Sequence, residues 1–132
     1  MIRLSPTALD TYNQCPALYK RRYVQRLRDK PTPALAVGNA VHRAMEVLNY
    51  ERQKKSPMAF EELRRVYDEA FKQEAPKVGA WNDKTPESEQ ERGFRMLARI
   101  AAATRDMMPA EVEQWFEFPL LGRPGFTLAG KI

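Results

Sequence analysis

Residues 34–48, ALAVGNAVHRAMEVL, decide how the rest of the chain is interpreted. Apolar residues recur in this stretch at helical spacing and predict a helix from about residue 34 to 53. His42, the only histidine of the chain, adjoins the predicted buried stripe at its edge. Gly38 lies four residues earlier on the same helix face, and its missing side chain leaves room for a metal ion or a phosphate. A histidine beside an apolar stripe is also typical of a hydrogen-bonded packing residue, so this stretch alone leaves both interpretations open.

Capping residues and prolines divide the remaining chain into further helices. Ser5-Pro6 and Thr85-Pro86 each place an N-cap residue before a proline that suits the first helical position. Ser56-Pro57 has the same order and predicts another start of this kind. Pro16 closes the first helix because a proline disfavours the helical conformation in the residue before it. The expected helices cover about residues 5–15, 16–27, 34–53, 56–75 and 85–108.

The hydrophobic pattern changes to a period of two after Pro109, which is typical of a β-strand. Residues 111–118 place apolar and polar side chains on opposite faces. The first face holds Val112, Phe116 and Phe118, and the second holds Glu111, Glu113, Trp115 and Glu117. Turn residues follow, and residues 126–132 predict a second strand that forms a hairpin with the first. The predicted fold class is an α+β fragment, mainly helical with about five helices, followed by a β-hairpin.

The length of 132 residues predicts a single domain, with a helical part at 1–109 and two strands at 110–132. The chain stops in mid-strand, so we expect it to be a fragment of a longer protein. Its 43% hydrophobic and 30% charged residues are typical of a soluble globular protein. No apolar run reaches the length of a membrane span, and the first residues lack a secretory signal. We therefore expect a cytoplasmic protein with no membrane partner.

The net charge of +5 is concentrated in one segment, residues 20–30. This basic segment contains one anion, Asp29, and six cations: Lys20, Arg21, Arg22, Arg26, Arg28 and Lys30. Tyr19 and Tyr23 interleave with the cations, which combines charge for phosphates with rings for sugars or bases. The segment predicts nucleic-acid binding, and a solvated basic helix is the alternative.

Several stretches, in the same order along the chain, resemble the RecB-type nucleases of the PD-(D/E)XK superfamily. Residues 5–19 fit the opening motif S-x-[ST]-x-L-x-x-Y-x-x-C-P-x-x-[FY] of those proteins, and Gly38 and His42 fit the following G-x-x-x-H helix. Residues 112–120 resemble the strand V-E-x-x-F-x-[FL]-P-L, and residues 128–132 resemble the strand L-x-G-[KR]-I-D up to its isoleucine. No single motif is very specific, and their joint occurrence carries the resemblance.

The resemblance implies that the chain is the first part of an α/β, restriction-endonuclease-like domain that hydrolyses phosphodiester bonds in DNA. Such hydrolysis requires a divalent cation, Mg²⁺ or Mn²⁺, to activate water and to neutralise charge on the phosphate. By resemblance, His42 would contribute to the metal site. Glu113 would be a further acidic catalytic residue, and a solvent-facing strand glutamate is the alternative. The residues expected to contact DNA are Tyr19, Lys20, Arg21, Arg22, Tyr23, Arg26 and Lys131.

The chain departs from the family pattern in the catalytic motifs. The aspartate of the L-x-G-[KR]-I-D strand would follow Ile132, and neither the (D/E)-x-K strand nor the Q-x-x-x-Y helix is present. We therefore predict that the 132-residue chain is inactive by itself, and that the protein from which it was cut is an exonuclease of DNA repair, recombination or phage DNA processing. A helicase or a recombination protein would be the partner class, and the sequence leaves the oligomeric state open.

Cys15, the only cysteine, cannot form an internal disulfide. Some relatives combine an early cysteine with three late ones to hold an iron–sulfur cluster, but a single thiolate cannot hold a cluster alone. A structural role is the other interpretation, and we favour it. For the whole chain, the alternative to a nuclease is a non-catalytic helical module that binds nucleic acid or another protein.

Overall fold

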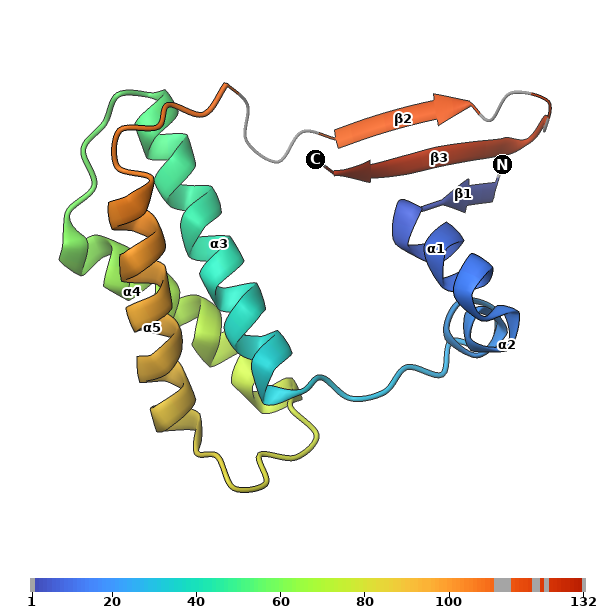
Figure 1. Ribbon diagram of the computed structural model, residues 1–132, viewed down its shortest axis with the longest axis horizontal. Coiled ribbons are helices and arrows are strands. Elements are labelled where there is room, and N and C mark those ends of the chain that lie inside the picture. Colours follow the sequence, from blue (N-terminus) through green and yellow to red (C-terminus); the bar gives the residue numbers. More distant parts are fainter. Residues whose placement is uncertain (1, 111–114, 120–121, 123, 132) are drawn as a thin grey trace. The chain divides into compact units, whose positions relative to one another are not determined.

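The computed structural model describes residues 2–110, 115–119, 122 and 124–131 (Figure 1). The helices in this part of the chain are α1 (Pro6–Gln14), α2 (Pro16–Tyr19), a π-helical segment (Lys20–Val24), α3 (Pro33–Gln53), α4 (Phe60–Glu74), a 3₁₀ turn (Ala75–Lys77) and α5 (Pro86–Ala103). The strands are β1 (Ile2–Leu4), β2 (Trp115–Pro119) and β3 (Phe126–Lys131). The chain divides into two compact units, residues 1–29 with 113–132 and residues 30–112, and each is described by itself. No described helix is long and apolar enough to cross a membrane.

The second unit consists of α3, α4 and α5, which enclose one apolar core. The core residues recur at helical spacing on each helix, as the apolar periodicity predicted. They are Val37, Ala40, Val41, Ala44 and Leu48 from α3, Leu63, Tyr67 and Phe71 from α4, and Phe94 and Leu97 from α5. Ala40 and Ala44 have no exposed surface, and their small side chains allow α3 to lie close to its neighbours.

Gly93 of α5 marks the tightest approach of these helices. A Cβ atom at this position would lie 2.1 Å from Tyr67 Oη and 2.7 Å from Val37 Cγ1. Real Cβ contacts essentially never come below 3.0 Å, so the packing of three helices at this point requires glycine.

Of the three helix starts predicted at Ser5-Pro6, Ser56-Pro57 and Thr85-Pro86, two are confirmed. Ser5 Oγ accepts a hydrogen bond from Ala8 N at 3.1 Å, and Thr85 forms a capping box with Ser88. The predicted start at Ser56-Pro57 is wrong, because α4 begins at Phe60.

Ser56 closes α3 instead of opening α4. Lys55 adopts a left-handed conformation with φ of 57°, and Ser56 N donates to Glu51 O at 2.9 Å. This is the hydrogen bond of a Schellman motif at a helix C-terminus. Two predicted helix ends are also too late. The helix that begins at Pro16 stops after Val24, followed by Arg26 with φ of 56°, and α5 stops at Ala103.

The first unit contains a three-stranded sheet in the order β1-β3-β2 (Figure 1). The predicted hairpin of β2 and β3 is confirmed as an antiparallel pair. The ring centroids of Phe116 and Phe118 lie 5.7 Å apart, as expected for two side chains on one face of the strand. The predicted positions of Glu111, Val112 and Glu113 lie outside the described residues. β1 was not predicted, and it pairs in parallel with β3, Ile2 opposite Phe126.

Gly130 of β3 lies directly opposite Phe116 of β2. A Cβ atom on Gly130 would lie 3.0 Å from Phe116 Cζ and 3.3 Å from Pro6 Cδ. The phenyl ring thus covers the glycine, a pairing that helps to fix strand register. The same contact brings the first turn of α1 against the sheet.

Candidate functional site

His42 lies on α3 in the second unit with an exposed side chain. Its neighbours Val41 and Ala44 are buried in the core, so His42 borders the apolar stripe from the solvent side. Gly38 is also exposed, and no heavy atom of the described residues lies within 4 Å of a Cβ atom placed on it. The described residues therefore leave space at the surface one turn before His42.

Asn39, next to Gly38, connects α3 to the end of α4. Its Nδ2 donates to Glu74 Oε2 at 2.9 Å, and Lys77 Nζ lies 2.5 Å from Glu74 Oε1. The hydrogen bond from Asn39, followed by that from Lys77, holds the pKa of Glu74 below its ordinary value. Glu74 thus stays ionised and fixes one end of α3. This contact could not be predicted from local sequence patterns, because its two partners are 35 residues apart.

The described residues do not form a complete metal site. Among them, no three His, Cys, Asp or Glu side chains lie close enough together to hold a metal ion. His42 can supply one imidazole ligand, and Glu113 lies outside the described residues. Lys131 is the last residue of β3, with its backbone opposite Trp115. The chemistry of His42 suits a divalent cation, but the described part of the chain provides no group of ligands to complete the site.

The basic segment begins on the short helices of the first unit. Lys20, Arg21 and Arg22 belong to the π-helical segment, Arg26 follows it, and all four side chains are exposed. Arg21 Nη2 forms an ion pair with Asp29 Oδ1 at 2.9 Å. In the part of the chain that the structure describes, no ion pair involves Lys20, Arg22 or Arg26. Three exposed cations thus remain available for an anionic partner.

Three tyrosines adjoin these cations. The Tyr19 and Tyr23 rings stack with centroids 5.1 Å apart and an interplanar angle of 26°. Tyr12 of α1 meets Tyr19 edge-on, with centroids 5.4 Å apart. The predicted DNA-contacting tyrosines therefore share one aromatic cluster, to which the structure adds Tyr12.

Trp115 and Arg3 are residues that the sequence reasoning missed. With Tyr19 and Tyr23 they line a depression of about 380 Å³ in the first unit. Trp115 is 57% exposed, and its place on the polar face of a predicted strand was an available signal. Arg3 gave no signal, because its position depends on β1, whose pairing was not predicted.

Cys15 lies between α1 and α2 with an exposed side chain. Its backbone N donates to Thr11 O at 2.9 Å, and its carbonyl accepts from Tyr19 N at 3.0 Å. These two backbone hydrogen bonds close the end of α1 and the start of α2, so Cys15 has a structural position at the junction of the two helices.

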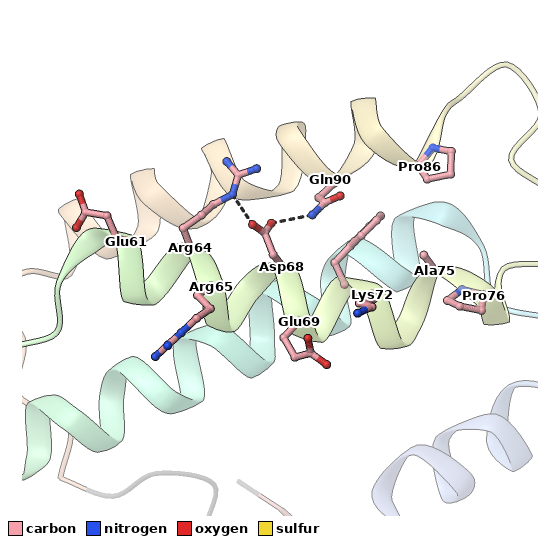
Figure 2. Close-up of a pocket in the computed structure, with 11 residues that line it drawn as sticks. Glu61, Arg64, Arg65, Asp68, Glu69, Lys72, Ala75, Pro76, Pro86 and Gln90 are labelled. Atoms are coloured by element: carbon pink, nitrogen blue, oxygen red, sulfur yellow. Dashed lines mark hydrogen bonds and ion pairs between the residues drawn. The ribbon is translucent and has the colours of Figure 1, made fainter.

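A larger depression of about 610 Å³ lies along α4 and the start of α5 (Figure 2). Arg64 Nε contacts Asp68 Oδ2 at 2.9 Å, and Gln90 Nε2 donates to Asp68 Oδ1 at 2.7 Å. Arg64 also pairs with Glu91 at 2.7 Å and lies over the Phe94 ring at 4.3 Å. The hydrogen bonds to Glu91 and Asp68 raise the pKa of Arg64 above its ordinary value. None of the predicted site residues lines this depression, and the paired groups serve to join α4 to α5.

Tyr67 completes this junction from the core side. Its side chain is fully buried, and Oη donates to Gln90 O at 2.9 Å. Burial raises the pKa of Tyr67 to about 12. The phenol is therefore a neutral structural group at physiological pH.

No curated protein and no solved structure matches the chain. A model of the PD-(D/E)XK nuclease superfamily matches residues 3–132.

Proposed function

The chain belongs to the PD-(D/E)XK nuclease superfamily, and from this membership we propose that it is the N-terminal part of a metal-dependent, RecB-like DNA exonuclease. The observation that carries the proposal is the extent of the family match, residues 3–132, which includes both compact units. The RecB-like motifs around Cys15-Pro16, Gly38, His42 and Gly130 support the narrower assignment. DNA repair, recombination or phage DNA processing is the expected setting, with a helicase or recombination protein as partner.

We assign His42 the role of a metal ligand in this nuclease. Its exposed position one turn after Gly38 supports the assignment, because no described heavy atom lies within 4 Å of a Cβ atom placed on Gly38. When bound, Mg²⁺ or Mn²⁺ would activate water and neutralise charge on the scissile phosphate. His42 must be neutral to bind a metal ion, and Mn²⁺ accepts an imidazole ligand more readily than Mg²⁺ does. Glu113 is proposed as a further acidic residue of the site.

The basic segment is proposed to hold the DNA backbone. Lys20, Arg22 and Arg26 are exposed, and no described carboxylate neutralises them. Arg21 shares its charge with Asp29, so we expect Arg21 to contribute less. Lys131 is proposed as an additional phosphate contact. Because such contacts release counterions from DNA, affinity should fall steeply as salt rises.

We expect no cleavage by the 132-residue chain alone, because its sequence contains no aspartate or glutamate two positions before a lysine. The purified chain, incubated with Mn²⁺ and linear single-stranded or duplex DNA, should leave both intact. Metal-dependent cleavage that disappears in His42→Ala would contradict this expectation.

The gene downstream of the codon for Ile132 separates the nuclease from the non-catalytic module. An aspartate codon directly after Ile132 and a later (D/E)-x-K strand would support the nuclease. A native stop codon at that place would overturn it.

Cys15 is proposed to act as a structural residue between α1 and α2. The gene-encoded protein, purified anaerobically, should then show no visible absorption from an iron–sulfur cluster. A cluster spectrum that Cys15→Ser abolishes would contradict this assignment.

A further inference from the structure

The aromatic cluster of the first unit points to a preference among nucleic acids. We propose that Tyr19, Tyr23 and Trp115 form a platform for unpaired bases, so that the chain binds single-stranded DNA more tightly than duplex. This inference rests on the proposed function, whose DNA-binding segment it deepens by naming the form of the substrate.

The rings are arranged to accept another flat group. Tyr19, the last residue of α2, and Tyr23, four residues later in the π-helical segment, stack nearly parallel, with an interplanar angle of 26°. Tyr12 abuts Tyr19 at 87° and supports it from the side. Each of Tyr19 and Tyr23 remains partly exposed, so this stack is not closed off by the core.

The depression beside the stack has the chemistry of a base site. Its volume is about 380 Å³, and Tyr19, Tyr23, Trp115 and Arg3 are among its lining residues. Trp115 is 57% exposed, so much of its indole ring is accessible to a ligand. Arg3 forms an ion pair with Glu117 at 3.3 Å. A ligand in the depression would therefore be recognised mainly by the aromatic rings.

Phosphate-binding charge adjoins the rings along the chain. Lys20 and Arg22 stand between Tyr19 and Tyr23, and both are exposed. Cations that alternate with aromatic rings are the usual combination in single-strand binding proteins, where rings stack on bases and cations follow the backbone.

A duplex cannot use the rings in this way. Its bases are stacked on one another and paired, so that their faces are covered, and only an unpaired base can turn out onto a protein ring. The cations serve both forms of DNA, and the rings serve only the single strand.

Three DNA ligands of equal length and fluorescent label test the proposal with the unmodified chain. They are an oligothymidine strand, the same number of abasic deoxyribose phosphates, and a duplex. Anisotropy titrations should give oligothymidine about tenfold tighter binding than the abasic strand, which carries the same charge without bases. The duplex should also bind about tenfold more weakly than oligothymidine. Equal affinity for oligothymidine and the abasic strand would overturn the platform.

Side-chain variants locate the effect. Tyr23→Leu and Trp115→Leu should each weaken oligothymidine binding about threefold and leave abasic binding unchanged, whereas Tyr23→Phe should retain full affinity. Tyr50→Leu is the matched control, because Tyr50 is an exposed tyrosine of the second unit, 42% exposed. Circular dichroism checks that each variant folds.

The outcomes separate this inference from the proposed function. Salt-dependent binding of all three ligands with equal affinity would overturn the platform and leave the DNA-binding role intact. No binding of any ligand at low salt would contradict the DNA-binding role itself, and the platform with it. An unchanged oligothymidine affinity in both leucine variants would also overturn the platform.

Discussion

Two glycines of the second unit should respond in opposite ways to substitution by alanine. A Cβ atom on Gly93 would overlap Tyr67 Oη and Val37 Cγ1, whereas a Cβ atom on Gly38 has no described heavy atom within 4 Å. Gly93→Ala should therefore lower the free energy of unfolding by about 1–3 kcal/mol, because overpacking displaces fixed core groups. Gly38→Ala should raise it by up to about 1 kcal/mol, because alanine is the better helix former. Urea unfolding followed by circular dichroism measures both, and equal effects of the two substitutions would contradict this packing.

Tyr67 should make the protein sensitive to alkaline pH. Its folded-state pKa of about 12 lies above the ordinary 10.0, so its contribution to stability is complete below pH 10 and is lost as the pH rises toward 12. The loss attributable to this phenol is roughly 2–3 kcal/mol. Urea unfolding across this range should show a smaller decline in Tyr67→Phe than in the unmodified chain.

The phenylalanine variant should be less stable at neutral pH by about 1 kcal/mol, because it lacks the hydrogen bond to Gln90 O. Phenolate absorbance gives a second readout, since the latest-titrating component should disappear in the variant. Identical alkaline titrations of the two proteins would show that Tyr67 is not the shielded group.

At the scale of elements, Arg64 is expected to hold α4 against α5. It contacts Asp68, Glu91 and the Phe94 ring, and its cation–π contact alone contributes roughly 0.5–1 kcal/mol. Arg64→Met should lower the melting temperature. Arg65→Met is the matched control, because Arg65 is 78% exposed and only reaches Glu62 at 3.6 Å. A control that destabilises the protein as much as Arg64→Met would refute the junction.

Local chemistry predicted those elements whose ends depend on nearby residues. Ser5 and Thr85 cap helices through hydrogen bonds that span three residues, so the sequence around them was sufficient. Ser56 misled the prediction because the same residue type can end one helix or begin another. The choice was made by the left-handed Lys55, whose conformation has no strong sequence signal.

β1 could not be predicted in this way because its partner is distant. Its three residues pair with β3, and Ile2 lies opposite Phe126. A strand this short has too little pattern to identify it, and its pairing is a property of the whole unit. Arg3 and the depression that it lines were missed for the same reason.

At the scale of the whole molecule, the salt dependence of DNA affinity should show how many phosphates the basic segment contacts. If Lys20 contacts one phosphate, Lys20→Gln should reduce the slope of log affinity against log salt by about 1. Arg22→Gln should do the same, because its side chain is similarly exposed. Lys72→Gln, an exposed lysine of α4, serves as the control. Slopes that do not change in the first two variants would exclude these phosphate contacts.

Only those parts of the candidate site whose residues are close together in the sequence could be predicted. The spacing of Gly38 and His42 on one helix, and the interleaved tyrosines and cations, are visible in the sequence because each group lies within a few residues. A metal centre collects ligands from separate strands, and a single histidine does not say which carboxylates will join it. Glu113 therefore remains a prediction from the family resemblance.

The most direct test of the account is cleavage by the protein expressed from its own gene through the native stop codon. We expect it to degrade linear DNA only with Mg²⁺ or Mn²⁺, and His42→Ala to lower the rate by on the order of a hundredfold or more, because even indirect partners of a metal ion cost 10–100-fold. Gly38→Ala, which should fold and be at least as stable, should also cut more slowly, because its methyl group enters the space beside His42. Cleavage that persists in EDTA, or that is unchanged in His42→Ala, would contradict the assignment of His42 to a nuclease metal site.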